Sequence, residues 1–251
     1  MASLREDPHL PGRLFIVEGI DGSGKTTQLD LLHKWLVSQG YLVVFTEWNS
    51  SPIVKRTTRR GKNKKLLSPV SFSLIHAADF ANRTHAQILP ALKAGAVVLA
   101  DRYVFTAFAR DAVRGVDPTW LRRLYSFAVK PTAAFYFDVP LTEALQRLAG
   151  GRLRLKYYEA GMDLRLSSDP EESFRLFQGL IRAEYDRLVD EFGLVRVDAS
   201  QSLVQQQHEM RGIVKRHLAG VTRNDHGRIQ DALRQAGLTG RYVRDGAGAW
   251  A

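Results

Sequence analysis

The sequence predicts an α/β protein in which a doubly wound parallel sheet of five strands is flanked by helices. Short apolar runs recur along the chain, segments with helical periodicity separate them, and most of these segments begin or end with a capping signal. Strands that alternate with helices form right-handed crossovers, which place helices on both faces of a parallel sheet. The 251 residues, 45% of them hydrophobic, suffice for the core of one such domain.

Five runs have the composition of strands buried on both faces of a sheet. The first reads Leu-Phe-Ile-Val, and the others consist mainly of Val, Ala, Leu, Phe and Tyr. In chain order, the expected strands are residues 14–17, 42–45, 96–100, 133–137 and 194–197.

The segments between these runs carry helix signals. Residues 26–38 place leucines on one stripe and end before Gly40, a natural C-cap. Ser68-Pro69 starts a long helix that runs towards Lys93 and is closed by Gly95, with serine as N-cap and proline in the first turn. Further helices are expected to start at Asp117-Pro118 and Asp169-Pro170, and to cover residues 201–218.

These elements place one domain at residues 13–218, with an N-terminal extension at 1–12. Residues 219–251 are rich in Gly and Arg and are expected to form an appended basic tail with one short helix. Cysteine is absent, and no apolar run reaches the about 20 residues of a membrane span. We therefore expect a cytoplasmic protein without disulfides.

The net charge of +10 is unevenly distributed. No acidic residue occurs between Glu47 and Asp79, whereas residues 55–65 include Lys55, Arg56 and five further Lys or Arg residues. Each of these charges alone is typical of a solvated face, but the cluster as a group indicates contact with a polyanion.

A phosphate-binding motif follows the first expected strand. Residues 19–26 read Gly-Ile-Asp-Gly-Ser-Gly-Lys-Thr and match G-x-x-x-x-G-K-[ST] between a strand and a helix. The glycines let backbone N–H groups surround phosphate oxygens, and the helix N-terminus adds positive potential. Lys25 is expected to contact the β- and γ-phosphates of ATP. The expected ATP-binding residues are Gly19, Asp21, Gly22, Ser23, Gly24, Lys25, Thr26 and Thr27.

A second element supports nucleotide binding. Residues 97–101 form an apolar strand that ends in Asp101, where a carboxylate beside the motif can hold Mg²⁺ through water. Thr26 and Asp101 are therefore the expected metal ligands. The two elements predict the three-layer fold of P-loop NTPases, with ATP and Mg²⁺ as the bound cofactors.

Several stretches together resemble the thymidylate kinase family of nucleoside monophosphate kinases. They are residues 15–27, Asp101-Arg102-Tyr103, residues 114–117 and residues 135–139, and the likeness extends over residues 13–218. The resemblance implies ATP-dependent phosphorylation of dTMP or a related nucleotide to the diphosphate, and a homodimer. Because an acceptor phosphate oxygen is already anionic, the reaction needs positioning and cations but no general base.

The resemblance also assigns roles to single residues. Arg102 would bind the acceptor phosphate, Asp21 would lie near the acceptor sugar hydroxyl, and residues 150–169 would form a lid over ATP. Within the lid, Arg165 is the nearest match to the family's lid arginine, and Arg152, Arg154 and Lys156 are further candidates. The expected catalytic residues are Lys25, Arg102, Arg165 and Asp21.

The acceptor side departs from the family pattern. The family's arginine after the second strand is absent from residues 46–49, its thymine-reading arginine is absent near residues 78–80, and its Tyr-Gln pair corresponds to Arg110-Asp111. The cations that could substitute are Arg83, Lys55 and Arg56, and these differences favour the hypothesis of a changed acceptor. The expected acceptor-binding residues are Glu47, Trp48, Asp79, Phe80, Arg102, Tyr103 and Arg110.

Two other functions remain open at this point. A deoxynucleoside kinase would use Glu47 as the base that takes a proton from the acceptor hydroxyl. A P-loop binding or regulatory module would contact nucleic acid through residues 55–65, although a basic segment beside an acceptor site already has a use.

Overall fold

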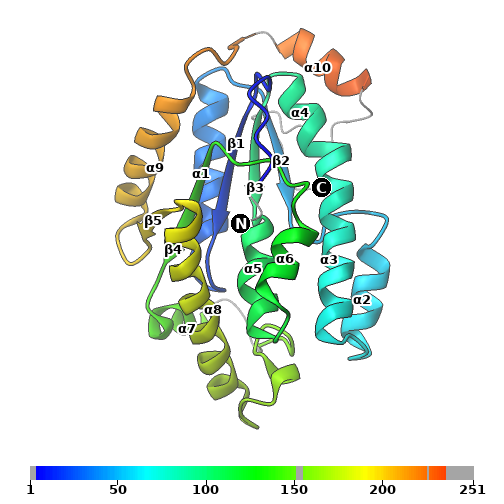
Figure 1. Cartoon of the computed structure of the whole chain (residues 1–251). Coiled ribbons are helices and arrows are strands. Elements are labelled where there is room, and N and C mark those ends of the chain that lie inside the picture. The colour runs from blue at the N-terminus through cyan, green and yellow to red at the C-terminus, as the bar shows by residue number, and fades with distance from the viewer. Residues whose placement is uncertain (1–3, 151–154, 225, 236–251) are drawn as a thin grey trace.

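The computed structural model describes residues 4–150, 155–224 and 226–235. Five parallel strands form one sheet in the order β2-β3-β1-β4-β5. Figure 1 shows this sheet in the middle of the molecule with helices around it, which confirms the predicted fold class. The strands are β1 (Arg13–Glu18), β2 (Val43–Glu47), β3 (Val97–Asp101), β4 (Ala133–Asp138) and β5 (Val195–Asp198).

Two pairs of helices cover the sheet. Helix α1 packs on β1, β2 and β3 and runs beside α9, whereas α8 packs on β4 and beside α5. The helices are α1 (Lys25–Ser38), α2 (Lys55–Asn63), α3 (Pro69–Arg83), α4 (Leu89–Lys93), α5 (Val104–Val113), α6 (Pro118–Leu124), α7 (Leu141–Ala149), α8 (Pro170–Phe192), α9 (Leu203–His217) and α10 (His226–Gln235). No helix within the described residues is both long and hydrophobic enough to span a bilayer.

The predicted long helix from Ser68 to Lys93 is present but interrupted. Ser68 caps α3, because its Oγ accepts a hydrogen bond from the Ser71 N–H at 3.2 Å. A π-helical turn at residues 84–88 then joins α3 to α4. Pro90 lies two residues after this turn, in the first turn of α4, and its missing N–H and bulky ring account for the departure from α geometry.

The packed body extends beyond residues 13–218 at both ends. In α10, Ile229 and Leu233 are 2% and 1% exposed and belong to the main core, as expected for an apolar i, i+4 pair. On the other side, Leu4 is buried, and Arg5 forms a parallel bridge with Val129. The described parts of both terminal segments therefore pack on the domain, and residues 236–251 lie outside the described residues.

Candidate active site

The phosphate-binding turn depends on glycine. Gly19, Gly22 and Gly24 have φ values of 147°, 85° and 82°. A Cβ on Gly22 would lie 2.5 Å from the Ala144 carbonyl oxygen, and one on Gly19 would lie 2.8 Å from the Phe137 carbonyl oxygen. No larger residue fits here without moving the backbone. Because α1 begins at Lys25, immediately after the turn, its free N–H groups lie at this site.

Lys25 lies deep in this turn. Its side chain is buried, and Nζ donates to the Ile20 carbonyl oxygen at 3.2 Å. Burial and the nearby Arg102 lower the pKa of Lys25 to about 8, although Asp101 and Asp21 act in the opposite direction. An anionic phosphate beside Nζ would favour the charged form again.

Thr26 and Asp101 lie together at the carboxyl end of the sheet. The Thr26 hydroxyl donates to Asp101 Oδ2 at 2.6 Å, so one α1 side chain meets the end of β3. Hydroxyl and carboxylate oxygens are suitable Mg²⁺ ligands. Nowhere in the described ranges do three or more His, Asp or Glu side chains cluster to hold a metal. This pair would therefore need phosphate oxygens and water to complete a magnesium shell.

Asp21 joins two arginines beside the phosphate-binding turn. Arg102 Nη2 donates to Oδ1 of Asp21, and Arg110 Nη2 donates to Oδ2 at 2.7 Å. Burial alone would raise the pKa of Asp21, but Arg110, Arg102 and Lys25 outweigh it and hold the pKa well below its usual range. The same pairing raises the pKa of Arg102 against the effect of burial. Asp21 therefore holds both guanidinium groups next to the place where phosphates would meet.

The backbone of Arg102 is held in a left-handed conformation, with φ of 69°. Its N–H donates to the Val17 carbonyl oxygen at 3.0 Å, and the next N–H, from Tyr103, donates to Glu18 Oε1 at 2.7 Å. Glu18 is fully buried, and it also accepts from the N–H and hydroxyl of Thr106 and from the hydroxyl of Tyr185. The end of β1 thus fixes the turn that carries Arg102 and caps α5.

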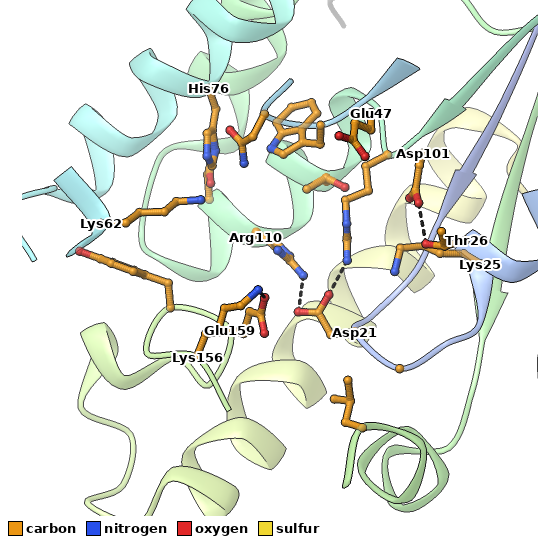
Figure 2. Close-up of a pocket in the computed structure, with 18 of the residues that line it drawn as sticks. Asp21, Lys25, Thr26, Glu47, Lys62, His76, Asp101, Arg110, Lys156 and Glu159 are labelled. Atoms are coloured by element: carbon orange, nitrogen blue, oxygen red, sulfur yellow. Dashed lines mark hydrogen bonds and ion pairs between the residues drawn. The ribbon is translucent and has the colours of Figure 1, made fainter. Parts of the chain in front are cut away.

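A cavity of about 470 Å³ opens from this centre. Figure 2 shows Lys25 and Thr26 at one end and Lys62 and His76 at the other, with Asp21 and Arg110 between them. The cavity therefore connects the phosphate-binding turn to a second group of side chains on α2, α3, α5 and the lid segment.

Comparison with known proteins agrees with this geometry. The family model for thymidylate kinase matches residues 17–210. This chain belongs to the thymidylate kinase family. It is 42% identical over 208 residues to a probable thymidylate kinase 2 of Saccharolobus solfataricus, covering 82% of this chain and 97% of the relative. It is 34% identical over 217 residues to a probable thymidylate kinase of Pyrococcus horikoshii, covering 84% of this chain and 99% of the relative.

Membership confirms the resemblance read from the sequence. The chain is an ATP-dependent phosphotransferase acting on a nucleoside monophosphate, as the family is. A deoxynucleoside kinase with Glu47 as base and a P-loop binding or regulatory module are not favoured.

Most of the residues expected in this thymidylate kinase site line the cavity. They are Asp21, Gly22, Gly24, Lys25, Thr26, Thr27, Glu47, Trp48, Asp101, Arg102 and Arg110. Gly19 shapes the turn instead, and Ser23 is fully buried behind it.

Three of the expected acceptor residues lie outside the cavity lining. Asp79 accepts from the N–H groups of Asn49 at 3.1 Å and Ser51 at 2.8 Å, and so holds the loop after β2. Phe80 is fully buried in the core, and the hydroxyl of Tyr103 donates to the Val129 carbonyl oxygen at 2.7 Å. These side chains support the site from behind rather than facing an acceptor.

The described part of the segment expected to form a lid, residues 155–169, contributes different residues from the one expected. Arg165 is exposed, with φ of 54°, and is absent from the cavity lining. The lid residues that do line the cavity are Lys156, Tyr158 and Glu159. Arg152 and Arg154 lie outside the described residues, and the role of Arg165 remains a prediction.

The suggested substitutes for the missing family arginines do not reach the cavity either. Arg83 is fully buried, donates through Nε to Thr46 Oγ1 at 3.0 Å, and lies 5.8 Å from the Trp48 ring centroid. Lys55 and Arg56 are exposed. The residue of this basic segment that does line the cavity is Lys62.

Several cavity residues were not assigned to ATP or to the acceptor in the sequence. Phe72 and His76 are one helical turn apart on α3, and their rings are in edge contact at 4.2 Å. Arg114 lies between Phe72 and Phe177 and binds Asp163 of the lid through Nε at 2.7 Å. This contact ties the segment expected to form a lid to the end of α5. The lining residues that were not expected to bind acceptor or ATP are Asn49, Lys62, Phe72, His76, Thr106, Asp111, Arg114, Leu148, Tyr158 and Glu159.

Proposed function

We propose that the chain converts dTMP and ATP to dTDP and ADP with the help of Mg²⁺. The observation that carries this proposal is the continuous cavity between the phosphate-binding turn and an aromatic, polar end. Arg102 lines this cavity and pairs with Asp21 between the two ends. The names of the relatives identify them as probable thymidylate kinases, and their sequences align with most of this chain. The departures on the acceptor side then change which residues hold dTMP.

Different residues of the site bind the ATP phosphates, Mg²⁺ and the acceptor phosphate. Lys25 and the N–H groups of the turn hold the β- and γ-phosphates of ATP. Mg²⁺, held by Thr26 and Asp101, would neutralise phosphate charge. Arg102 exchanges Asp21 for the acceptor phosphate, a suitable ligand for its planar fork. Asp21 is then free to accept a hydrogen bond from the acceptor sugar.

The phosphoryl transfer depends on how the two substrates are positioned and requires no proton transfer from the acceptor. The acceptor phosphate oxygen is already anionic, so it attacks the γ-phosphoryl group without a general base. Cations around the junction stabilise the charge that the transferring group spreads over its oxygens. The lid, which Arg114 and Asp163 hold to α5, keeps water from the cavity.

The test combines binding with turnover. Magnesium-dependent ATP binding, measured by calorimetry, and diphosphate formation from a panel of nucleoside monophosphates should both occur with the wild type. Lys25→Ala should lower kcat by about 10²–10³-fold, because one preorganised charge at the transferring phosphoryl group is lost. Lys34→Ala, on the exposed side of the same helix, is the matched control and should change neither ATP binding nor kcat. ATP binding that ignores both magnesium and Lys25→Ala would refute the proposal.

A homodimer and a cytoplasmic location belong to the same proposal. On α3, Val70 and Leu74 are 50% and 49% exposed and lie one turn apart, and contact with a second copy would cover them. Light scattering gives the oligomeric state directly.

A further inference from the structure

Lys62 differs from the other cations of the basic segment. Its side chain lines the cavity, and Nζ lies 5.0 Å from the centre of the Phe72 ring. Among the described residues, no carboxylate lies within ion-pair distance of it. Burial and the neighbouring Arg110, Arg114 and Lys156 lower its pKa to about 8, with Glu159 acting in the opposite direction. A half-buried ammonium group in this position has donors to offer and no protein anion to receive them.

Asp111 is the acidic counterpart at the same end of the cavity. The carboxyl group is almost fully buried, and the Ser73 hydroxyl donates to Oδ2 at 2.7 Å. Within the described residues, Oδ1 has no hydrogen-bond partner, although Asp111 lines the cavity. Lys62 lowers the pKa of this carboxyl group against the effect of burial, and both side chains line the same cavity. Lys62 offers hydrogen-bond donors, and Oδ1 of Asp111 offers a hydrogen-bond acceptor.

The orientation of the acceptor decides what these two groups meet. The acceptor phosphate must lie beside the phosphate-binding turn, because it attacks the γ-phosphate of ATP held there. Figure 2 places Lys62 at the opposite end of the cavity, beyond Asp21 and Arg110. A nucleotide with its phosphate at the turn therefore directs its base towards Lys62, Phe72 and Asp111.

We propose that Lys62 and Asp111 read the base of the acceptor. The Lys62 ammonium donates to a ring carbonyl oxygen, while the free Oδ1 of Asp111 accepts from the neighbouring ring N–H. This pattern fits a 2,4-dioxopyrimidine and disfavours cytosine, which presents an amino group and an unprotonated ring nitrogen at the same edge. The inference rests on the proposed function, since it assumes a nucleotide acceptor with its phosphate at Arg102.

The lid and the base-reading end are in contact. Tyr158 of the lid lies 5.5 Å from Phe72, and Lys65 lies 4.1 Å from the centre of the Tyr157 ring. Lys62 and Tyr158 thus approach the same ring, one from α2 and one from the lid. A base between Lys62 and Asp111 therefore lies beside Phe72 and Tyr158.

The test measures selectivity by calorimetric binding of dTMP and dCMP to the full chain. The wild type should prefer dTMP. Lys62→Met should weaken dTMP binding by about 10–100-fold and dCMP binding much less, because one charged hydrogen bond to the carbonyl is lost. Lys64→Met, an exposed cation two residues further on, is the matched control and should leave both affinities unchanged.

A second variant examines the acceptor side of the pair. Asp111→Asn keeps the shape of the side chain but presents an amide N–H, which suits the unprotonated ring nitrogen of cytosine. The ratio of dTMP affinity to dCMP affinity should therefore fall in this variant. Thermal unfolding of each variant checks that the fold is retained.

The outcomes separate this inference from the proposed function. Equal loss of both nucleotides in Lys62→Met, or an effect no larger than that of Lys64→Met, would overturn the base-reading role. Turnover of dTMP, measured in parallel, tests the kinase: selective binding without turnover would overturn the proposed function alone. A wild type that binds no nucleoside monophosphate would overturn both.

Discussion

The two ends of the cavity are built in different ways. The ATP end is formed by consecutive residues of one turn, and its phosphate donors are backbone N–H groups at the start of α1. The acceptor end is formed by side chains from α2, α3, α5 and the lid, which are brought together by packing. The backbone cradle tolerates little change, since a Cβ at Gly22 would collide with the Ala144 carbonyl group. Single side chains at the other end can be exchanged without altering the turn.

This difference explains how a family member can keep its ATP site and still depart at the acceptor. A cationic side chain can contact the acceptor from any element that places its charged group at the right position, including a neighbouring helix. Lys62 on α2 lines the cavity although the family's arginines are absent from their usual positions. The contrast predicts large effects where the two ends meet and smaller, selective effects further out.

The largest effect is expected at the junction, in Arg102→Met. The substitution removes the guanidinium that bridges Asp21 and the Gly19 carbonyl oxygen, to which Nη1 donates at 3.2 Å. Without it, kcat/KM for dTMP should fall by about 10²–10³-fold, while the KM for ATP should change only a few-fold. Steady-state kinetics with each substrate varied in turn measures this. Arg123→Met, which changes an exposed arginine on α6, should behave as the wild type. A loss in kcat/KM below about fivefold in Arg102→Met would show that Arg102 does not bind the acceptor phosphate.

Much of the fold could be predicted because its signals are local. The five strands begin and end within one or two residues of the apolar runs, and the caps Ser68, Asp117 and Asp169 accept backbone hydrogen bonds as expected. The ATP end was predictable for the same reason, since its residues are consecutive. The main disagreement is at α10, where Ile229 and Leu233 pack into the core although their segment resembles a tail.

The acceptor end could not be predicted from local signals. On α3, the sequence suggested Asp79 and Phe80, but the turn that faces the cavity carries Phe72 and His76. Which face of α3 meets the cavity depends on its packing against α5, and a single helix does not show this. Likewise, a run of cations does not show that Lys62 alone among residues 55–65 lines the cavity.

A moderate effect is expected from pH, measured as the affinity for dTMP in the absence of ATP. The pKa of Lys62 is lowered to about 8, so the donor is charged at pH 7 and mostly neutral at pH 9. Binding that uses this charge is complete below the pKa and is lost as pH rises through it, so wild-type affinity should fall about tenfold over this interval. In Lys62→Met this loss should be absent.

The other groups around Lys62 determine how this profile is read. Arg110 and Arg114 are the guanidinium groups near Lys62. The pKa of His76 is lowered well below its ordinary value by burial and nearby cations, and that of Asp111 is raised to about 6 by burial. Neither His76 nor Asp111 therefore changes its main charge state between pH 7 and 9. Lys25 has a pKa in the same range, and Lys156 and Glu159 also face the cavity. Lys25, Lys156 and Glu159 are present in both the wild type and Lys62→Met, so their effect on dTMP affinity cancels in the comparison. If dTMP affinity falls equally with pH in both proteins, the pH effect belongs to Lys25.

The smallest effect is expected at Glu47, and it is informative because it is small. Glu47 ends β2 beside Asp101 and lines the cavity, where a base for a hydroxyl acceptor would have to lie. A phosphate acceptor has no proton to lose, so Glu47→Gln should lower kcat with dTMP by less than about threefold, and thymidine should not be phosphorylated. A hydroxyl acceptor would instead lose about 10²–10⁴-fold in kcat. The charge of the acceptor is therefore tested by one neutral, nearly isosteric change at the edge of the site, with Lys25 and Arg102 intact.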